Sequence, residues 1–237
     1  MKPYQPNESL IDGFSILQVL AGSRAPISCT ELSKELGIEI TRVNRILKTF
    51  AYIGVTHQTS SKKYIPGPGM QVLAAQSLYG SGLLQSSMKL LKGLMKHNMV
   101  VALGVLWMDK VSFLFHWEPG MEFEAAIGRI SLQPATLSGV GMAILGQKTD
   151  EEIMQLYKGK EIPGYGKNLP DLLSDIAKIR KQGYSKVLNN PSPVNIAVTI
   201  GEPVYASIAI AGDINADEEK NIVACLKEIA LLIEQYM

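Results

Sequence analysis

Five polar side chains recur at short intervals in one stretch of the chain, and their chemistry suits a contact with nucleic acid. They are Thr41, Arg42, Asn44, Arg45 and Lys48. Arginine and asparagine pair with base edges in the major groove of DNA, and lysine and threonine bind phosphates. If one helix carries all five, its exposed face is suited to double-stranded DNA.

The apolar residues in the same stretch predict that helix. They recur in steps of three and four residues, which is the pattern of a helix that buries one face. These residues are Val43, Ile46, Leu47, Phe50 and Ile53. The polar residues named above fall on the opposite face.

A second, shorter helix is predicted just before it. Ser28 and Glu31 have the spacing of a capping box, in which each bonds to the backbone amide of the other. Gly37 allows the positive φ that a sharp turn between two helices needs. Residues 28–53 therefore predict a helix-turn-helix. The same pattern is also typical of two amphipathic helices whose polar faces simply lie in solvent.

A β-hairpin is predicted directly after this motif. Residues 55–58 and 64–65 have strand character, and a polar turn between them contains Lys62 and Lys63. Such a turn is commonly just a solvated loop, but after a helix-turn-helix it is placed to reach phosphates or a minor groove. We interpret the whole as a winged helix.

Composition limits the class of protein. The chain has 237 residues, 46% of them hydrophobic, which is enough for two domains. The net charge is only +1, yet residues 39–63 hold five Lys or Arg and one Asp or Glu. Cys29 and Cys225 show no zinc or disulfide spacing, so we expect a reducing cytosol. No apolar run of membrane-spanning length occurs, and we expect a cytoplasmic protein with no membrane contact.

The remaining sequence predicts an α+β fold with three parts. Residues 1–66 form the winged helix, residues 67–82 a linker helix and hinge, and residues 83–237 an α/β domain for effector binding and oligomerisation. In this last part, strands are expected at 99–108, 111–117, 185–188, 194–200 and 203–211, with turns at Asp109-Lys110 and Gly201-Glu202. In residues 118–137 the apolar side chains do not recur at the spacing of a helix or a strand, so this segment is expected to be a long loop.

The order of these parts resembles the isocitrate-lyase-regulator (IclR) family of bacterial transcription factors. The matching segments are LIDGFSILQVLA, ISCTELSKELGIEITRVNRILKTFAYIGV, KKYIPGPGM, SGVGMAIL, IRKQGY and EPVYASIAIAG. The resemblance implies a C-terminal GAF/PAS-like domain that binds a small metabolite. It also implies a homodimer or tetramer on palindromic operator DNA. The chain departs from the family at Met142, where a lysine is usual, and at residues 189–194.

The effector site is predicted from residues around the long loop. Apolar side chains there are either ordinary core or the wall of a pocket, and nearby polar groups can orient a ligand such as an aromatic or other organic acid. The candidate effector contacts are Trp117, Met121, Phe123, Arg129, Thr136, Ser138 and Ser207.

No residue set for catalysis, a cofactor or a metal is predicted. His57, His97 and His116 lie far apart and lack neighbouring ligands at metal spacing, which is more typical of structural histidines. We therefore predict a non-enzymatic transcriptional regulator that binds operator DNA through Thr41, Arg42, Asn44, Arg45 and Lys48, with Lys62 and Lys63 on the flanking backbone. Two alternatives stay open. One is a metabolite-binding or enzymatic domain whose winged helix contacts protein, and the other is a regulator whose sensor domain has lost its ligand.

Overall fold

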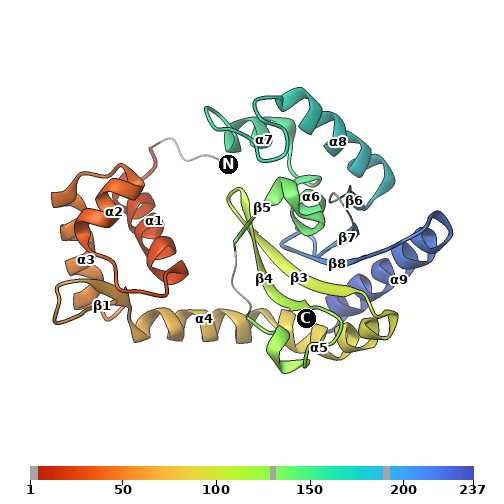
Figure 1. Cartoon of the computed structure of the whole chain (residues 1–237), viewed down its shortest axis with the longest axis horizontal. Helices are drawn as coiled ribbons and strands as arrows, with labels where there is room; N and C mark the ends of the chain where they lie inside the picture. The colour runs from red at the N-terminus through yellow and green to blue at the C-terminus, as the bar shows by residue number, and fades with distance from the viewer. Residues whose placement is uncertain (1–4, 129–131, 189–192) are drawn as a thin grey trace. The chain divides into compact units, whose positions relative to one another are not determined.

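The computed structural model describes residues 5–128, 132–188 and 193–237 (Figure 1). The chain divides into two compact units, and the division falls between Gly80 and Ser81.

The first unit contains four helices and a small antiparallel hairpin within its described residues. A core of buried side chains from the first three helices and the hairpin, including Leu20, Leu32, Val43 and Leu47, holds it together. The elements are α1 (Glu8–Gly22), α2 (Cys29–Leu36), α3 (Ile40–Tyr52), β1 (Thr56–Gln58), β2 (Tyr64–Pro66) and α4 (Pro68–Ser81). This is a helix-turn-helix followed by a wing.

Local sequence determines the ends of these helices. The Ser28 hydroxyl accepts a bond from the Glu31 amide at 3.2 Å, and the Ser28 amide donates to the Glu31 carboxylate at 2.7 Å. This is the predicted capping box at the start of α2. After α2, Gly37 adopts a φ of 67°, a left-handed conformation that glycine tolerates without a Cβ clash.

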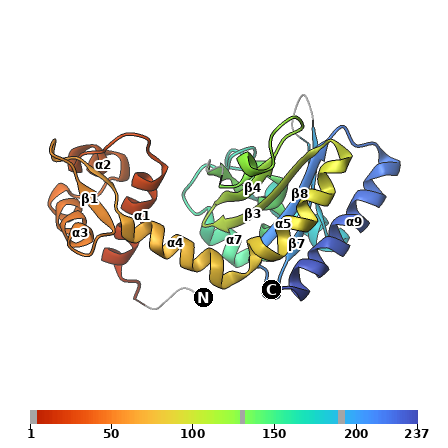
Figure 2. The same cartoon turned by 90° about the horizontal axis from the view of Figure 1, so that it is seen from below.

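The second unit is built on a six-stranded antiparallel sheet with strand order β5-β4-β3-β8-β7-β6. In Figures 1 and 2, helices α6, α7 and α8 cover one face, and α5 and α9 cover the other. The strands are β3 (Val100–Trp107), β4 (Lys110–Trp117), β5 (Gln133–Pro134), β6 (Ser185–Leu188), β7 (Val194–Ile200) and β8 (Ala206–Gly212). The helices are α5 (Leu83–Leu94), α6 (Gly139–Leu145), α7 (Asp150–Leu156), α8 (Leu169–Gln182) and α9 (Ala216–Gln235). The predicted α+β class is confirmed.

Large and small side chains alternate along the central strands, so the two faces of the sheet differ. Ile208 and Ile210 of β8 pack toward α5 and α9, whereas Ala209 packs toward α6. On β7, Ile196 and Ala197 are divided in the same way. Small side chains allow α6 to approach the sheet closely, and they also leave space beside it.

A β-bulge in β4 changes which aromatic residues share a face. Leu103 pairs with Phe115 but the next residue, Gly104, pairs with Phe113, so Leu114 is an extra residue. As a result Phe113 packs toward α6, whereas Phe115 packs toward α5 and α9. Regular alternation along a strand would put both side chains on one face.

Three element predictions need correction. β5 lies in the segment that was expected to be a loop, where Val111 pairs with Gln133. β8 begins at Ala206 rather than at residue 203, because the turn after β7 covers residues 201–204 and is longer than the predicted Gly201-Glu202 turn. The hairpin turn is Met108-Asp109, since Trp107 pairs with Lys110.

Among the helices within the described ranges, none is both long and apolar enough to cross a membrane. The same residues contain no cluster of three or more His, Cys, Asp or Glu side chains that could hold a metal ion.

Candidate nucleic-acid interface and ligand pocket

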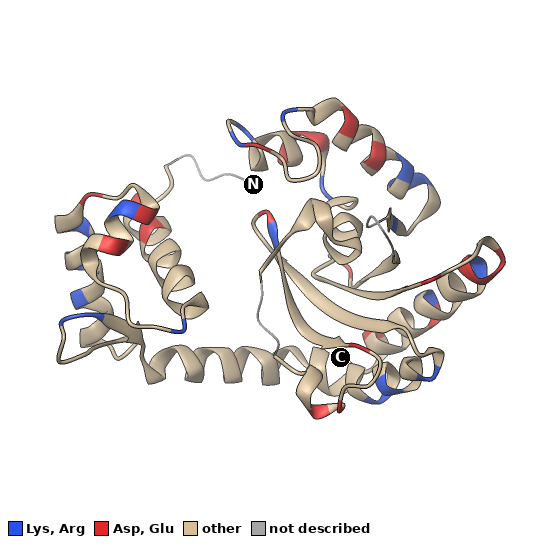
Figure 3. Cartoon of the chain, viewed as in Figure 1, with Lys and Arg blue, Asp and Glu red and all other residues tan. Residues whose placement is uncertain are grey.

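The exposed face of α3 is polar and positively charged. Thr41, Arg45 and Lys48 are exposed and follow one another in steps of four and three residues, whereas Asn44 is half-buried. Their spacing places them on one side of the helix. Figure 3 shows Lys and Arg positions on α3 and on the loop of the hairpin that follows.

Two of the predicted DNA contacts are already engaged within the first unit. Arg42 Nε lies 2.7 Å from Asp12 Oδ2 on α1, an ionic contact rather than a well-directed hydrogen bond. Lys63 Nζ lies 3.5 Å from Glu31 Oε1. Both cations would have to leave a carboxylate in order to bind a phosphate.

The other three cations of this surface are available. Within the described part of the chain, Arg45, Lys48 and Lys62 form no ion pair. Lys62 is exposed in the loop between β1 and β2 and has a φ of 59°. Such a left-handed conformation is uncommon outside glycine and turns the chain sharply.

The structure adds three residues that sequence reasoning missed. Glu39 caps α3 by accepting bonds from the amides of Thr41 at 3.1 Å and Arg42 at 3.2 Å. Ile40 is 44% exposed in the first turn, and Tyr52 is 91% exposed at the last residue of the helix. Two of the three could have been found from the predicted helix. Tyr52 lies four residues after Lys48, which puts it on the same face, and Glu39 immediately precedes the helix, where a side chain can cap it.

A small cavity lies on the α6 face of the sheet in the second unit, with a volume of about 170 Å³. Its walls are largely apolar and come from five strands and the segments next to them. The lining residues are Val100, Ala102, Phe113, His116, Gln133, Leu137, Pro193, Asn195, Ala209 and Ala211. The alanines on this face create the space, because the isoleucines of the same strands point the other way.

The polar groups of this cavity are His116, Gln133 and Asn195. His116 Nδ1 lies 3.6 Å from a carboxylate oxygen of Glu118, which forms an ion pair when the imidazole is protonated. The Asn195 amide fills the space where Gly139 lacks a side chain, because a Cβ at Gly139 would lie 2.2 Å from Asn195 Oδ1. Asn195 thus connects the cavity to the start of α6.

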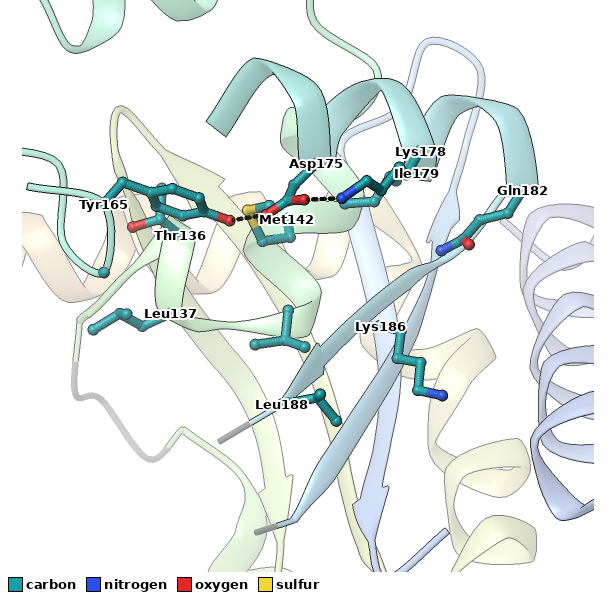
Figure 4. Close-up of a pocket in the computed structure, with 12 residues that line it drawn as sticks. Thr136, Leu137, Met142, Tyr165, Asp175, Lys178, Ile179, Gln182, Lys186 and Leu188 are labelled. Carbon is teal, nitrogen blue, oxygen red and sulfur yellow. Dashed lines mark hydrogen bonds and ion pairs between the residues drawn. The ribbon is translucent and has the colours of Figure 1, made fainter. Parts of the chain in front are cut away.

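A larger, more open groove of about 480 Å³ lies beside α8 and β6 (Figure 4). Figure 4 shows the Tyr165 hydroxyl directed at Asp175, to which it donates a bond at 2.9 Å. Lys178 Nζ lies 2.7 Å from the other oxygen of Asp175. The hydrogen bond from Lys178 holds the pKa of Asp175 below its usual value. Asp175 and Lys178 are therefore paired with each other, whereas Lys186, which also lines the groove, pairs with Glu219 at 2.6 Å.

Three predicted effector contacts belong to the core under α5 and α9 rather than to the small cavity. Trp117 is buried and donates from Nε1 to the carbonyl of Met121 at 2.6 Å, and Phe123 packs against Phe115. The bulge at Leu114 explains this placement, because it turns Trp117 to the opposite face from Phe113. This position does not support their assignment as ligand contacts.

The polar residues predicted for the effector site bond within the fold. Thr136 lines the larger groove, and its hydroxyl donates to the carbonyl of Pro163 at 2.6 Å. Ser138 caps α6, and Ser207 is fully buried and donates to the carbonyl of Val198 at 2.7 Å. Arg129 lies outside the described residues.

Comparison with known proteins gives a consistent answer. No family model matches the chain. It is similar in sequence to the transcriptional repressor IclR of Escherichia coli, with 26% identity over 192 residues that cover 75% of this chain and 68% of the relative. Its fold is similar to that of a putative IclR transcriptional regulator from Silicibacter, with a TM-score of 0.78, 17% identity and coverage of 96% and 95%. The chain is thus similar in sequence and in fold to transcriptional regulators of the IclR family.

A second solved structure is informative about ligands of that family. The fold matches an IclR homolog from Microbacterium hydrocarbonoxydans in complex with 4-hydroxybenzoate, with a TM-score of 0.68, 18% identity and coverage of 96% and 98%. The relatives are transcriptional regulators and not enzymes. The resemblance to the IclR family that was predicted from the sequence is confirmed, whereas the individual DNA and effector contacts of this chain stay predictions.

Proposed function

We propose that this protein is a sequence-specific DNA-binding transcriptional regulator of the bacterial cytoplasm, and that a small molecule bound by its second unit modulates operator affinity or assembly. One observation carries the proposal. Arg45 and Lys48 lie exposed on the second helix of a helix-turn-helix, with Lys62 in the wing, and none of them is neutralised by a carboxylate in the described structure. Such cations bind phosphates and base edges.

The three available cations divide by position. Arg45 lies near the middle of α3 and is suited to a bidentate bond with a guanine, because its guanidinium has a fixed fork of donors. Lys48 and Lys62 are suited to phosphates as point charges. Thr41 and Asn44 complete the face, whereas Arg42 and Lys63 contribute only after they leave Asp12 and Glu31.

The proposed DNA binding can be tested in two steps. The full-length protein first selects duplexes from a pool of random sequences, and its affinity for the selected duplex is then measured by fluorescence anisotropy. Arg45→Ala should weaken binding to the selected duplex about 5- to 150-fold and lose preference at one base pair, as expected for one bidentate contact. Lys62→Ala should weaken selected and unrelated duplexes alike and lower the salt dependence by about one phosphate contact. Lys220→Ala, on α9, is the control with the same charge change.

The small cavity is the proposed effector site. Cavities of about 150 Å³ accommodate benzene, so a volume of about 170 Å³ suits a single six-membered ring. His116 and the amides of Gln133 and Asn195 are groups that can donate hydrogen bonds to the carboxylate or hydroxyl of an organic acid. The relative that binds 4-hydroxybenzoate supports ligands of this class.

Thermal-shift titration with 4-hydroxybenzoate, benzoate and a sugar acid tests the cavity. A bound ligand raises the melting midpoint by mass action. Ala211→Leu should abolish the shift by filling the cavity, whereas Lys178→Ala in the larger groove should leave it unchanged. An equal shift in both variants and the wild type would assign the ligand to neither site.

We further propose a homodimer, or a tetramer built from dimers, because apolar side chains are exposed on two helices of the first unit. Leu10 of α1 is 60% exposed and Leu73 of α4 is 62% exposed, and α4 has no buried residue. Exposed apolar groups of this kind are typical of contact surfaces. Sedimentation equilibrium should show Leu10→Asp with Leu73→Asp as a smaller species than the wild type, and a dimer of unchanged affinity would exclude this surface.

A further inference from the structure

The first turn of α3 differs chemically from the rest of its exposed face. Glu39 and Ile40 precede Thr41, so a carboxylate and an apolar side chain occupy the end of the helix where cations and small polar residues could bind a phosphate. Both side chains are exposed to solvent. In helix-turn-helix proteins the N-terminal residues of this helix contact base edges. Glu39 and Ile40 therefore lie where contacts with base edges are expected.

The Glu39 carboxylate has capacity for one further hydrogen bond. Its Oε1 accepts from the Thr41 amide at 3.1 Å, and its Oε2 accepts from the Arg42 amide at 3.2 Å and from the Thr41 hydroxyl. A carboxylate offers about four acceptor positions, two on each oxygen. One position on Oε1 is left, and in solvent a DNA donor can take it in place of water.

These bonds also keep the carboxylate ionised and oriented. Hydrogen bonds from Thr41 are the main cause that lowers the pKa of Glu39, and the nearby charge of Arg45 adds to the effect. A fixed negative charge repels DNA phosphates, so this end of α3 is unsuited to the backbone. Donors in the major groove are provided only by the amino groups of cytosine and adenine.

Cytosine suits the site better than adenine. The adenine amino group lies next to N7, an acceptor that would face the carboxylate unfavourably, whereas the cytosine amino group has no acceptor of its own base beside it in the groove. Ile40 is 44% exposed next to Glu39 and offers an apolar surface to a thymine methyl group.

We propose, as an extension of the DNA-binding function above, that Glu39 is a specificity-determining residue whose Oε1 accepts a hydrogen bond from a cytosine amino group in the operator. Ile40 contacts the methyl group of a neighbouring thymine. The helix cap and the base contact share one carboxylate, so the cap orients the group that reads the base.

Selection from random duplexes tests the assignment with the full-length wild type and three variants. The wild type should select cytosine at one position, next to thymine. Glu39→Gln should change that preference toward adenine, which a glutamine side chain recognises, by about 10-fold in relative affinity. Glu39→Ser keeps a side chain that caps helices well but is too short to reach a base, so it should keep the melting midpoint and lose the cytosine preference.

Glu35→Gln is the matched control, because Glu35 is an exposed glutamate of α2 with the same charge change. It should raise affinity for all duplexes without altering the selected sequence. If Glu39→Gln and Glu39→Ser select the same sequence as the wild type, Glu39 is only a cap and the inference is overturned. If the wild type selects no sequence at all, the proposed sequence-specific DNA binding is wrong. This outcome differs from unchanged selection by the Glu39 variants, so the experiment separates an error in the proposed function from an error in the role of Glu39.

Discussion

The exposed face of α3 and the cavity under α6 are the two regions that carry the proposed function, and they are assembled in opposite ways. The α3 face comes from a single helix of 13 residues, and its chemistry lies in charged side chains. The cavity needs strands β3, β4, β5, β7 and β8, and its chemistry lies in small side chains that leave space. The residues proposed to bind DNA therefore lie close together in the sequence. The proposed effector cavity, by contrast, forms only when strands that are far apart in the sequence pair in the folded sheet.

The largest expected effect comes from the core beneath the α3 face. Leu47 is fully buried in the first unit, and Leu47→Ala should lower the free energy of unfolding of that unit by about 2–5 kcal/mol. DNA affinity should fall because the helix is no longer held. Hydrogen exchange resolved along the chain should show loss of protection in residues 8–66 with unchanged protection in the sheet of the second unit.

Thr49→Ala is the control for that substitution, because Thr49 is exposed on the same helix. It should leave exchange unchanged. Equal loss of protection in both units after Leu47→Ala would contradict the division of the chain into two separately packed units.

The cavity is tested by Gly139→Ala. The added Cβ would lie 2.2 Å from Asn195 Oδ1, so the amide must move away from the start of α6. Overpacking of this kind costs about 1–3 kcal/mol, and the displaced amide should alter ligand binding. Chemical denaturation and thermal-shift titration with 4-hydroxybenzoate measure the two effects.

Gly93→Ala is the matched control within helix α5, where a Cβ would meet no atom of the described residues within 4 Å. It should stabilise the protein by about 0.5–1 kcal/mol, because alanine is the better helix former. A loss of stability as large as that of Gly139→Ala would show that Asn195 is not the cause.

The contrast between the two regions also explains what could be predicted from the sequence. The capping box at Ser28, the turn at Gly37 and the period of α3 are local signals, and the fold of the first unit follows from them. The ion pair between Arg42 and Asp12 could not be predicted, because the two residues lie on different helices. The bulge at Leu114 could not be predicted for a similar reason, because a bulge depends on the register with the partner strand. The bulge places Trp117 on the face opposite the cavity.

Asp12→Asn should have a smaller effect, and one that sharpens the assignment of the α3 face. Arg42 would lose its ion partner, which for a partly exposed pair costs about 0.2–1 kcal/mol of folding free energy. The released guanidinium should raise DNA affinity and make it more salt-dependent by about one phosphate contact. Anisotropy titrations at several salt concentrations measure this slope.

Asp217→Asn, an exposed residue of α9, makes the same charge change in the second unit. If it raises affinity as much as Asp12→Asn does, then net charge rather than release of Arg42 is responsible.

The smallest expected effect concerns the acid stability of the first unit, in which carboxylates cap α2 and α3. Hydrogen bonds with Ser28 are the main cause that lowers the pKa of Glu31, and bonds from Thr41 lower that of Glu39. A carboxyl whose pKa is lower in the folded state stabilises the fold fully above its unfolded value, about 4.3 for glutamate. That contribution is lost as the pH falls through the folded-state pKa.

The melting midpoint of the first unit should therefore be insensitive to these two groups between pH 8 and about 5 and fall below that range. In Glu31→Gln the midpoint should be lower at neutral pH, and its decrease in acid should be shallower than in the wild type, because one proton fewer is taken up on unfolding. Glu35→Gln, on the same helix α2, should keep the wild-type slope, since Glu35 is not a capping residue. If the melting midpoint of Glu31→Gln falls with pH as steeply as that of the wild type, then the Glu31 carboxylate does not contribute to the pH dependence of stability.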